Sequence, residues 1–185
     1  MERPPIGVLA LQGGFEAHER MFARVGAPTR EVRVAADLDG VAGLVIPGGE
    51  STTIALGIER EGLAQPIRDL AAAGRPILGT CAGLIMLDSA HLALMDITAR
   101  RNAFGRQLHS FEENLSIGCL PGGPLHAIFI RAPWIERAGP DVEVLASVDG
   151  HPVAAREGEL FAVSFHAELG ADTRLHAAFA ERTVL

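Results

Sequence analysis

Apolar runs and helical patterns alternate along the first half of the chain. Residues 6–11 are apolar and end at the glycine-containing stretch 12–14, which predicts a buried strand that runs into a turn. Residues 15–25 then carry apolar side chains at helical spacing and stop at Gly26. The same patterns predict strands at residues 29–34, 44–46 and 77–78. They also predict three more helices: one capped by Ser51 or Thr52, one over residues 63–73, and one that follows Cys81.

The second half of the chain has a different pattern. Residues 126–133, 142–150, 151–157 and 160–168 are short strand-like segments with turn residues between them, and residues 172–182 form a last helical pattern. Alternating strands and helices predict an α/β fold with a mostly parallel central sheet and helices on both faces. The short strands predict an antiparallel extension of that sheet. No linker divides the chain, so we expect a single domain over residues 1–185.

Turn-forming glycines and residues with polar or reactive side chains follow several of the predicted strands. They are Gln12-Gly13-Gly14, the stretch Pro47-Gly48-Gly49-Glu50, the stretch Gly79-Thr80-Cys81, and His166 after the apolar run 160–165. Ligands of open α/β sheets bind outside the carboxyl ends of the strands. We therefore expect these four places to meet at one edge of the sheet.

Composition narrows the class of protein. The chain has 185 residues, of which 48% are hydrophobic, enough for a substantial core. Its net charge of −7 argues against a nucleic-acid-binding face. Two cysteines are too few for a disulfide framework or a Cys-only metal cluster. The sequence shows neither a signal-peptide pattern nor an apolar run that would span a membrane, so we expect a cytoplasmic setting.

Cys81 lies in the stretch Gly79-Thr80-Cys81-Ala82-Gly83, which has the form Gly-x-Cys-x-Gly. This is the thiol counterpart of the Gly-x-Ser-x-Gly elbow, a tight turn that places a nucleophile at a helix N-terminus. The alternative is a buried structural cysteine among small packing residues. Cys119, in "SIGCLPGG", has no comparable setting, and we interpret it as structural.

Two further stretches carry complementary chemistry. In "SFHAE", Glu168 follows His166 by two residues, and an extended segment would place both side chains on one side, as base and orienting carboxylate. The N–H groups of Gly49 and Ala82 are candidate oxyanion donors. The alternatives are a surface His-x-Glu pair and an ordinary glycine turn.

Taken together, "PGGES", "GTCAGL" and "SFHAEL" resemble class I, or triad-type, glutamine amidotransferase domains. "GVLALQGG", "GGESTTI", "RRNAFGRQLHSFE" and "FIRAP" resemble more specifically the family of glutaminase subunits of pyridoxal 5′-phosphate synthase, PdxT/SNO. The resemblance runs from about residue 6 to about residue 180. It implies a flavodoxin-like three-layer sandwich.

The resemblance also implies an activity and a partner. L-Glutamine would be hydrolysed to glutamate and ammonia, and the ammonia would pass to a (β/α)8-barrel synthase subunit that builds pyridoxal 5′-phosphate. Cys81 would be the nucleophile that forms a glutamyl thioester, His166 the general base and acid, and Glu168 the residue that orients it. No metal and no organic cofactor would be needed.

Glutamine binding is likewise implied for a defined set of residues. Free glutamine carries an α-ammonium and an α-carboxylate, so its pocket needs an anion and a cation. Without the resemblance, the arginines of this set would be interpreted as surface residues. The implied set is Gly49, Glu50, Ser51, Arg101, Ile130 and Arg131, with Gln12-Gly13 near the active site and the partner contact.

The chain departs from the family pattern at two places. Ala167 stands where the family has a proline between histidine and glutamate, and the segment "LDSAHLALMD" after the elbow is short. Two other functions remain open: a regulatory module whose triad is unused, and another cysteine-elbow hydrolase or chaperone. The intact set of Cys81, His166 and Glu168 disfavours the first, and "SFHAE" near the C-terminus disfavours the second.

Overall fold

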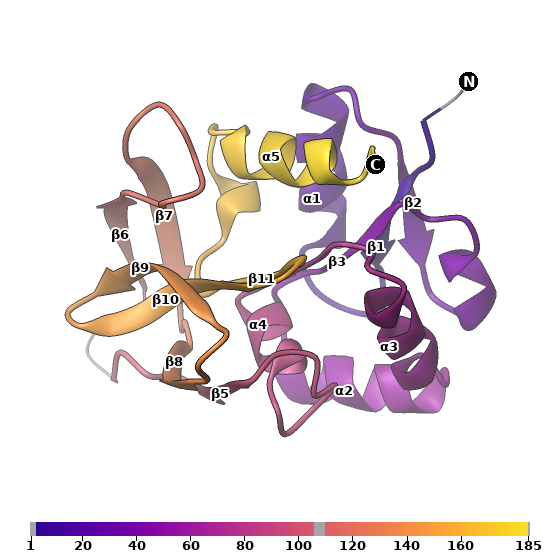
Figure 1. Cartoon of the computed structure of the whole chain (residues 1–185), viewed down its shortest axis with the longest axis horizontal. Coiled ribbons are helices and arrows are strands. Elements are labelled where there is room, and N and C mark those ends of the chain that lie inside the picture. Colours follow the sequence, from indigo (N-terminus) through magenta and orange to yellow (C-terminus); the bar gives the residue numbers. More distant parts are fainter. Residues whose placement is uncertain (1–2, 106–109, 185) are drawn as a thin grey trace.

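The computed structural model describes residues 3–105 and 110–184 and centres on one twisted sheet (Figure 1). The strands of this sheet lie in the order β2 (Thr29–Val32), β1 (Ile6–Leu9), β3 (Gly43–Ile46), β4 (Ile77–Thr80), β11 (Leu160–Val163), β10 (His151–Glu157) and β9 (Glu143–Val148). The first five strands are parallel, and β10 and β9 add to them as an antiparallel extension. The predicted α/β class with a mostly parallel sheet is therefore confirmed.

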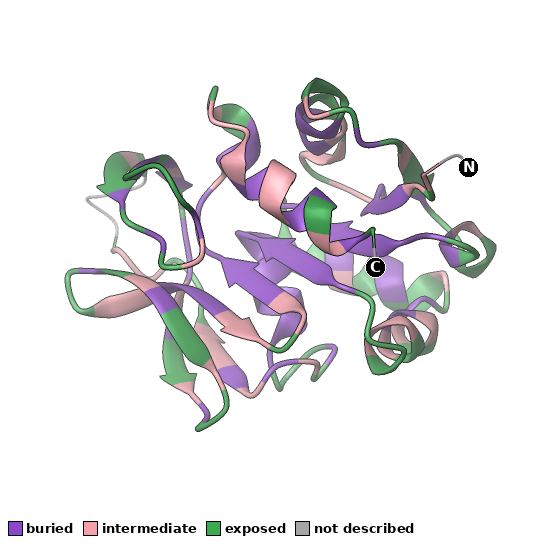
Figure 2. Cartoon of the chain, turned by 45° about the horizontal axis from the view of Figure 1, so that its top comes forward, coloured by how far each residue is buried: buried purple, intermediate pink, exposed green. Residues whose placement is uncertain are grey.

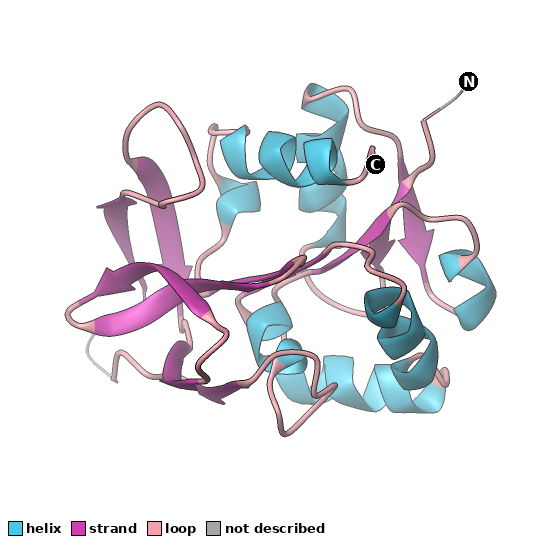
Figure 3. Cartoon of the chain, viewed as in Figure 1, coloured by secondary structure: helices cyan, strands magenta, loops and turns pink. Residues whose placement is uncertain are grey.

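Helices cover both faces of the sheet and complete three layers (Figure 3). On one face lie α1 (Phe15–Arg24) and α5 (Arg174–Arg182), and on the other lie α2 (Ser51–Arg60), α3 (Ala64–Ala72) and α4 (Ala82–Leu87). A short 3-10 helix, η1 (Ala35–Leu38), follows β2. None of the helices within the described ranges has both the length and the apolar composition needed to cross a membrane.

Successive residues of a strand point to opposite faces of the sheet. The layers are therefore stabilised by two hydrophobic cores. Leu78 packs in the core that contains Phe22 of α1 and Phe179 of α5. Its neighbour Ile77 packs in the other core, with Ile54 of α2. Strands β1, β3 and β4 are buried along their whole length, as Figure 2 shows for the middle of the sheet. A nearly continuous apolar run is typical of a strand covered on both faces.

The structure corrects three details of the predicted fold. The segment 160–168 was expected in the antiparallel extension, but β11 pairs with β4 in parallel. The segment 126–133 was expected there too, but β7 (Leu125–Ile130) pairs with β6 (Ser110–Leu115) in a separate two-stranded sheet. A second small sheet joins β5 (Ile97–Arg100) to β8 (Trp134–Ala138), which were not predicted. Periodicity identifies a strand but does not identify the strand that pairs with it.

The structure also corrects the predicted N-cap of α2. The helix begins at Ser51, and the capping residue is Glu50 rather than Ser51 or Thr52. The Glu50 carboxylate accepts a hydrogen bond of 2.9 Å from the Thr53 backbone N–H. An ionised carboxylate at this place is a strong acceptor that also complements the helix dipole. Ser51 is buried as the first residue of the helix.

Candidate active site

Cys81 occupies a strained turn between β4 and α4. Its backbone adopts φ 50° and ψ −106°, a left-handed conformation that side chains disfavour and that functional sites retain. Glycines make the turn possible: a Cβ on Gly79 would collide with the carbonyl of Gly83, and a Cβ on Gly83 would collide with the carbonyl of Ile46. The small neighbours in the Gly-x-Cys-x-Gly stretch are therefore required by close backbone packing.

His166 and Glu168 follow directly after β11. Nδ1 of His166 lies 2.6 Å from Oε1 of Glu168, and because an ionised carboxylate only accepts, Nδ1 is the donor. The two side chains were expected to meet across an extended segment, but Ala167 opens a 3-10 helix, η2 (Ala167–Leu169), with His166 as its N-cap. This tight turn brings the side chains together with alanine at the position where the family has proline.

Cys81 and His166 both lie against Gly48 in the loop after β3. A Cβ on Gly48 would be 2.5 Å from Cε1 of His166 and 3.1 Å from Cβ of Cys81, so only glycine fits there. Sγ of Cys81 also contacts the carbonyl oxygen of Ile130, at 3.9 Å, which is too long to hold the sulfur strongly. The sulfur is thus free to interact with the imidazole beside it.

The charge state of this group follows from its surroundings. Burial lowers the pKa of His166, but hydrogen bonding with the Cys81 sulfur and with the Glu168 carboxylate outweighs burial and raises the pKa to about 10. Burial raises the pKa of Glu168, but the hydrogen bond from His166 and the nearby imidazoles bring it below its usual value. At neutral pH the imidazole is protonated and the carboxylate is ionised.

Two buried histidines behind Glu168, His18 and His176, were not singled out by the sequence. Nε2 of His18 lies 3.5 Å from Oε2 of Glu168 and 3.0 Å from Oγ1 of Thr80, and its Nδ1 lies 2.9 Å from Nε2 of His176. Burial lowers the pKa of His18, so its approach to Glu168 is not an ion pair at neutral pH. The available signal was a histidine on the apolar face of a helical pattern, three residues before Met21.

One cavity of about 320 Å³ gathers the predicted residues at the carboxyl edge of the sheet. The four sequence stretches that were expected to meet contribute Gln12, Glu50, Cys81 and His166 to it. Glu168 stands behind His166, outside the lining. The lining is Gln12, Gly49, Glu50, Ser51, Cys81, Ala82, Ile85, Arg101, Asn102, Ile130, Arg131, Pro133 and His166, of which Ile85, Asn102 and Pro133 were not predicted.

Charged groups of both signs stand at this cavity. Nη2 of Arg101 lies 3.1 Å from Oε1 of Glu50, and both side chains are half exposed. Backbone hydrogen bonds hold the turn next to them: the Gly48 N–H donates to Oγ1 of Thr80 at 3.1 Å, and the Glu50 N–H donates to Oε1 of Gln12 at 2.7 Å. The N–H groups on both sides of Gly49 are therefore already engaged.

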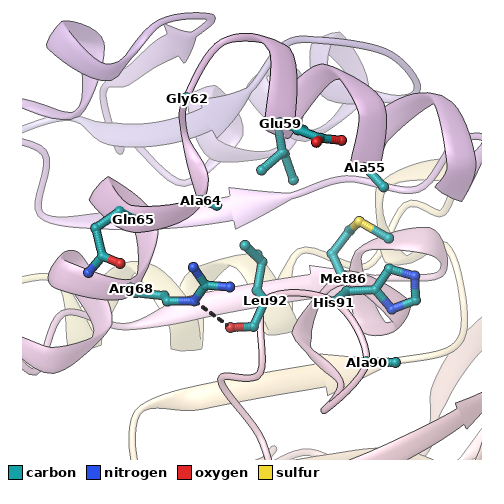
Figure 4. A pocket seen from close by; sticks show the side chains of 11 residues that line it. Ala55, Glu59, Gly62, Ala64, Gln65, Arg68, Met86, Ala90, His91 and Leu92 are labelled. Atoms are coloured by element: carbon teal, nitrogen blue, oxygen red, sulfur yellow. Dashed lines mark hydrogen bonds between the residues drawn. The ribbon is translucent and has the colours of Figure 1, made fainter.

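A larger cavity, of about 490 Å³, lies elsewhere in the molecule (Figure 4). It opens between α2, α3 and the loop after α4, where Nε of Arg68 donates to the Leu92 carbonyl at 2.9 Å. None of the predicted site residues lines it. Its greater volume does not make it the better candidate, because the described residues that line it include no cysteine, serine or threonine to serve as a nucleophile.

Cys119 has a different environment from Cys81. It lines a small apolar cavity of about 40 Å³ with Phe161 and Phe179. Burial raises the pKa of its thiol, which keeps it in the unreactive neutral form at neutral pH.

Comparison with known proteins identifies the family. The sequence model described as the SNO glutamine amidotransferase family matches residues 8–185. This chain belongs to the SNO glutamine amidotransferase family. It is 50% identical to a protein of Salinispora arenicola named pyridoxal 5′-phosphate synthase subunit PdxT, over 98% of this chain and 97% of the relative. A protein of the same name from Dehalococcoides mccartyi is 52% identical, over 95% of each chain.

A solved structure agrees with this membership. The crystal structure of a glutamine amidotransferase matches the chain with a TM-score of 0.91 and 42% identity, over 97% of this chain and 99% of that one. The chain is thus a SNO-family amidotransferase over nearly its whole length. In the block "RRNAFGRQLHSFE", residues 106–109 lie outside the described part of the chain, whereas Arg101 and Asn102 line the cavity.

Proposed function

We propose that this SNO-family chain hydrolyses L-glutamine to L-glutamate and ammonia with Cys81, His166 and Glu168 as its catalytic triad. The observation that carries the proposal is the meeting of three features that are far apart in the sequence. A strained cysteine elbow and an imidazole face one cavity, and a buried carboxylate holds the imidazole from behind at 2.6 Å. Nucleophile, base and orienting group in this relation are the elements of a triad.

The first step forms the thioester. The Cys81 sulfur attacks the Cδ carbonyl carbon of glutamine, and the carbonyl electron pair moves onto oxygen. His166 donates its proton to the departing nitrogen, the C–N bond breaks, and ammonia leaves. A protonated imidazole next to a cysteine favours the nucleophilic thiolate, and the raised pKa of His166 supplies that proton at neutral pH.

The second step restores the enzyme. Neutral His166 takes a proton from water, the oxygen of that water bonds to the thioester carbon, and the C–S bond breaks to release glutamate. Sulfur leaves with the electron pair of the C–S bond beside the protonated imidazole, which readies the group for the next glutamine. Both steps pass through an oxyanion, for which the N–H groups of Gly49 and Ala82 are the donors we infer.

The cavity suits free glutamine as substrate. Glu50 supplies the anion for the α-ammonium group, and Arg101 or Arg131 supplies the cation for the α-carboxylate. Gly49, Ser51 and Ile130 complete the binding surface we propose. The hydrogen bond between Arg101 and Glu50 holds the two charges 3.1 Å apart before glutamine enters, which lowers the cost of ordering them.

We further infer that the ammonia serves pyridoxal 5′-phosphate synthesis by a partner subunit. The name of the relatives, pyridoxal 5′-phosphate synthase subunit PdxT, supports this role. The family resemblance supports a (β/α)8-barrel synthase as the partner, a cytoplasmic setting, and one glutaminase domain over residues 1–185. The hydrolysis itself uses no metal or organic cofactor in this proposal.

The deciding experiment is ammonia release from glutamine, measured with and without a pyridoxal 5′-phosphate synthase subunit of the same source. We expect low activity of the chain alone and higher activity with the partner, which would order the Gly49 turn. Cys81→Ala is expected to abolish ammonia release while leaving the fold and partner binding nearly unchanged. Cys119→Ala is the matched control and is expected to retain activity.

A glutamine analogue with an electrophilic diazoketone provides the chemical counterpart. It should label Cys81 and leave Cys119 unmodified, because only Cys81 lines the cavity next to His166. Glutamine hydrolysis that persists in Cys81→Ala would overturn the proposed function.

A further inference from the structure

A chain of buried polar side chains continues from the triad into the core. Oε2 of Glu168 is buried and forms no hydrogen bond within the described residues, and its neighbour is Nε2 of His18 at 3.5 Å. His18 and His176 are both 0% exposed, and their ring nitrogens Nδ1 and Nε2 lie 2.9 Å apart. Burying polar groups in a core costs free energy, so we expect these side chains to have a role that offsets this cost.

The contacts decide which ring nitrogen of His18 carries the proton. With hydrogen on Nε2, His18 donates toward Oγ1 of Thr80 at 3.0 Å and faces Oε2 of Glu168 with a positive N–H dipole. His176 then donates from its Nε2 to Nδ1 of His18, and its own Nδ1, which has no partner within the described residues, needs none as a bare lone pair.

The opposite tautomer, with hydrogen on Nδ1 of His18, is unfavourable for both neighbours of His18, namely Glu168 and His176. It would aim the lone pair of His18 Nε2 at an ionised carboxylate, and it would leave a buried N–H on Nδ1 of His176 without an acceptor. We therefore assign the Nε2–H form to His18.

Thr80 extends the effect of His18 to the other side of the site. Its hydroxyl oxygen lies 3.0 Å from Nε2 of His18 and accepts the Gly48 N–H at 3.1 Å. Thr80 directly precedes Cys81, and Gly48 lies against both Cys81 and His166. A single imidazole thus contacts the carboxylate that orients the base and the hydroxyl that holds the Gly48-Gly49 turn.

We propose that His18 is a positioning residue of the glutaminase triad: its Nε2–H donates to Oγ1 of Thr80 and directs the positive end of its dipole at Oε2 of Glu168, 3.5 Å away, and so orients the His166 imidazole and the Gly48-Gly49 turn. This inference rests on the proposed glutaminase function. His176 supports it by fixing the tautomer of His18 through the 2.9 Å contact. His18 touches neither the cavity nor the substrate we propose.

The titratable groups around His18 agree with a neutral donor. They are Glu168 on η2, His166 at its start, and His176 on α5. Burial lowers the pKa of His18 more than Glu168 raises it, and burial with the nearby His18 lowers the pKa of His176 to about 3. Both imidazoles are uncharged at neutral pH, so they order the carboxylate without neutralising it.

Two amide variants separate positioning from packing. His18→Gln can place an N–H where Nε2 stands, whereas His18→Asn can reach only the place of Nδ1. In the complex with the synthase subunit, we expect His18→Asn to lower kcat for ammonia release about 10-fold or more with KM changed less than about 2-fold, and His18→Gln to keep most of kcat. The alkaline limb of the kcat/KM profile should move to lower pH in His18→Asn only.

The outcomes are distinct. Equal kcat in the two variants, or a loss of thermal stability with kcat and the pH profile unchanged, would show that His18 serves packing alone and overturn the inference. His126→Asn, on the exposed side of β7, is the control and should behave as wild type. If wild-type chain with its partner releases no ammonia, the proposed function fails first.

A second measurement needs no variant. In wild-type protein labelled with ¹⁵N histidine, NMR is expected to show the His18 ring neutral with hydrogen on Nε2 at pH 7. A protonated ring or an Nδ1–H tautomer would overturn the inference even where both variants fail to fold. This readout does not depend on glutaminase activity and therefore keeps the two proposals separable.

Discussion

Nδ1 of His166 and Oε1 of Glu168 share a hydrogen bond of 2.6 Å that, together with the Cys81 sulfur, sets the charge of the imidazole facing the cavity. Without a partner, burial would leave this imidazole neutral, and a neutral imidazole could not give a proton to departing ammonia. With Glu168 behind it and the Cys81 sulfur in front, its pKa rises to about 10. The proposed chemistry therefore depends on a carboxylate that does not contact the substrate.

This pair predicts the pH dependence of activity. The alkaline limb of kcat/KM for glutamine is expected near the raised pKa of His166, about 10, because above it the imidazole loses the proton that ammonia needs. Glu168→Gln keeps the shape but removes the charge, so its alkaline limb should move to lower pH and kcat should fall less than in Cys81→Ala. An unmoved limb would contradict the assigned role of Glu168.

The same pair predicts how stability varies with pH. The pKa of His166 is raised above 6.5, so its contribution to the free energy of unfolding is fully present below pH 6.5 and is lost as pH rises through about 10. The pKa of Glu168 is lowered below 4.5, so its contribution is present above pH 4.5 and is lost as pH falls through the folded value. The melting temperature of wild type should decline from pH 6.5 to about 10 more than that of Glu168→Gln. Parallel curves would show that the pair does not couple to folding.

Arg101 is expected to act on substrate binding rather than on chemistry. Arg101→Ala removes a cation from the cavity and, by loss of a charge-assisted hydrogen bond of about 1.5–3 kcal/mol, should raise KM for glutamine about 10-fold or more with a smaller change in kcat. Arg100→Ala is the matched control, since the Arg100 side chain pairs with Glu136 and stacks on Trp134 outside the cavity. A similar KM in both variants would remove Arg101 from the binding set.

Gly83→Ala is expected to lower the melting temperature, because the elbow has no room for a side chain at this position. A Cβ there would collide with the backbone carbonyl of Ile46 in β3, which cannot move without disturbing the sheet. Overpacking of this kind costs about 1–3 kcal/mol, which lowers the melting temperature of a chain this long by roughly 2–12 °C. Gly118→Ala is the control, because its Cβ would meet nothing within 4 Å, and it should melt near wild type. Equal melting temperatures would contradict the tight packing of the elbow.

Much of the parallel half of the fold could be predicted from local sequence. Strands β1, β3 and β4 are short apolar runs that a glycine-containing turn or the elbow soon follows, and such runs are typical of strands buried on both faces. The pairing of β11 with β4, and the separation of β7 from the central sheet, could not be predicted in this way. Strand partners are chosen by long-range packing, and no short window of sequence carries that information.

The sequence by itself determined which reactive groups the chain has and in what local settings they stand. The glycines around Cys81 already indicated a tight turn, and the spacing of His166 and Glu168 already indicated a pair. Only the tertiary structure decided that Cys81 and His166 share one cavity, that a 3-10 turn joins His166 to Glu168, and that His18 and His176 stand behind that pair. Local spacing constrains neighbours along the chain, whereas contacts between α1, α5 and the end of β11 arise only when the layers pack.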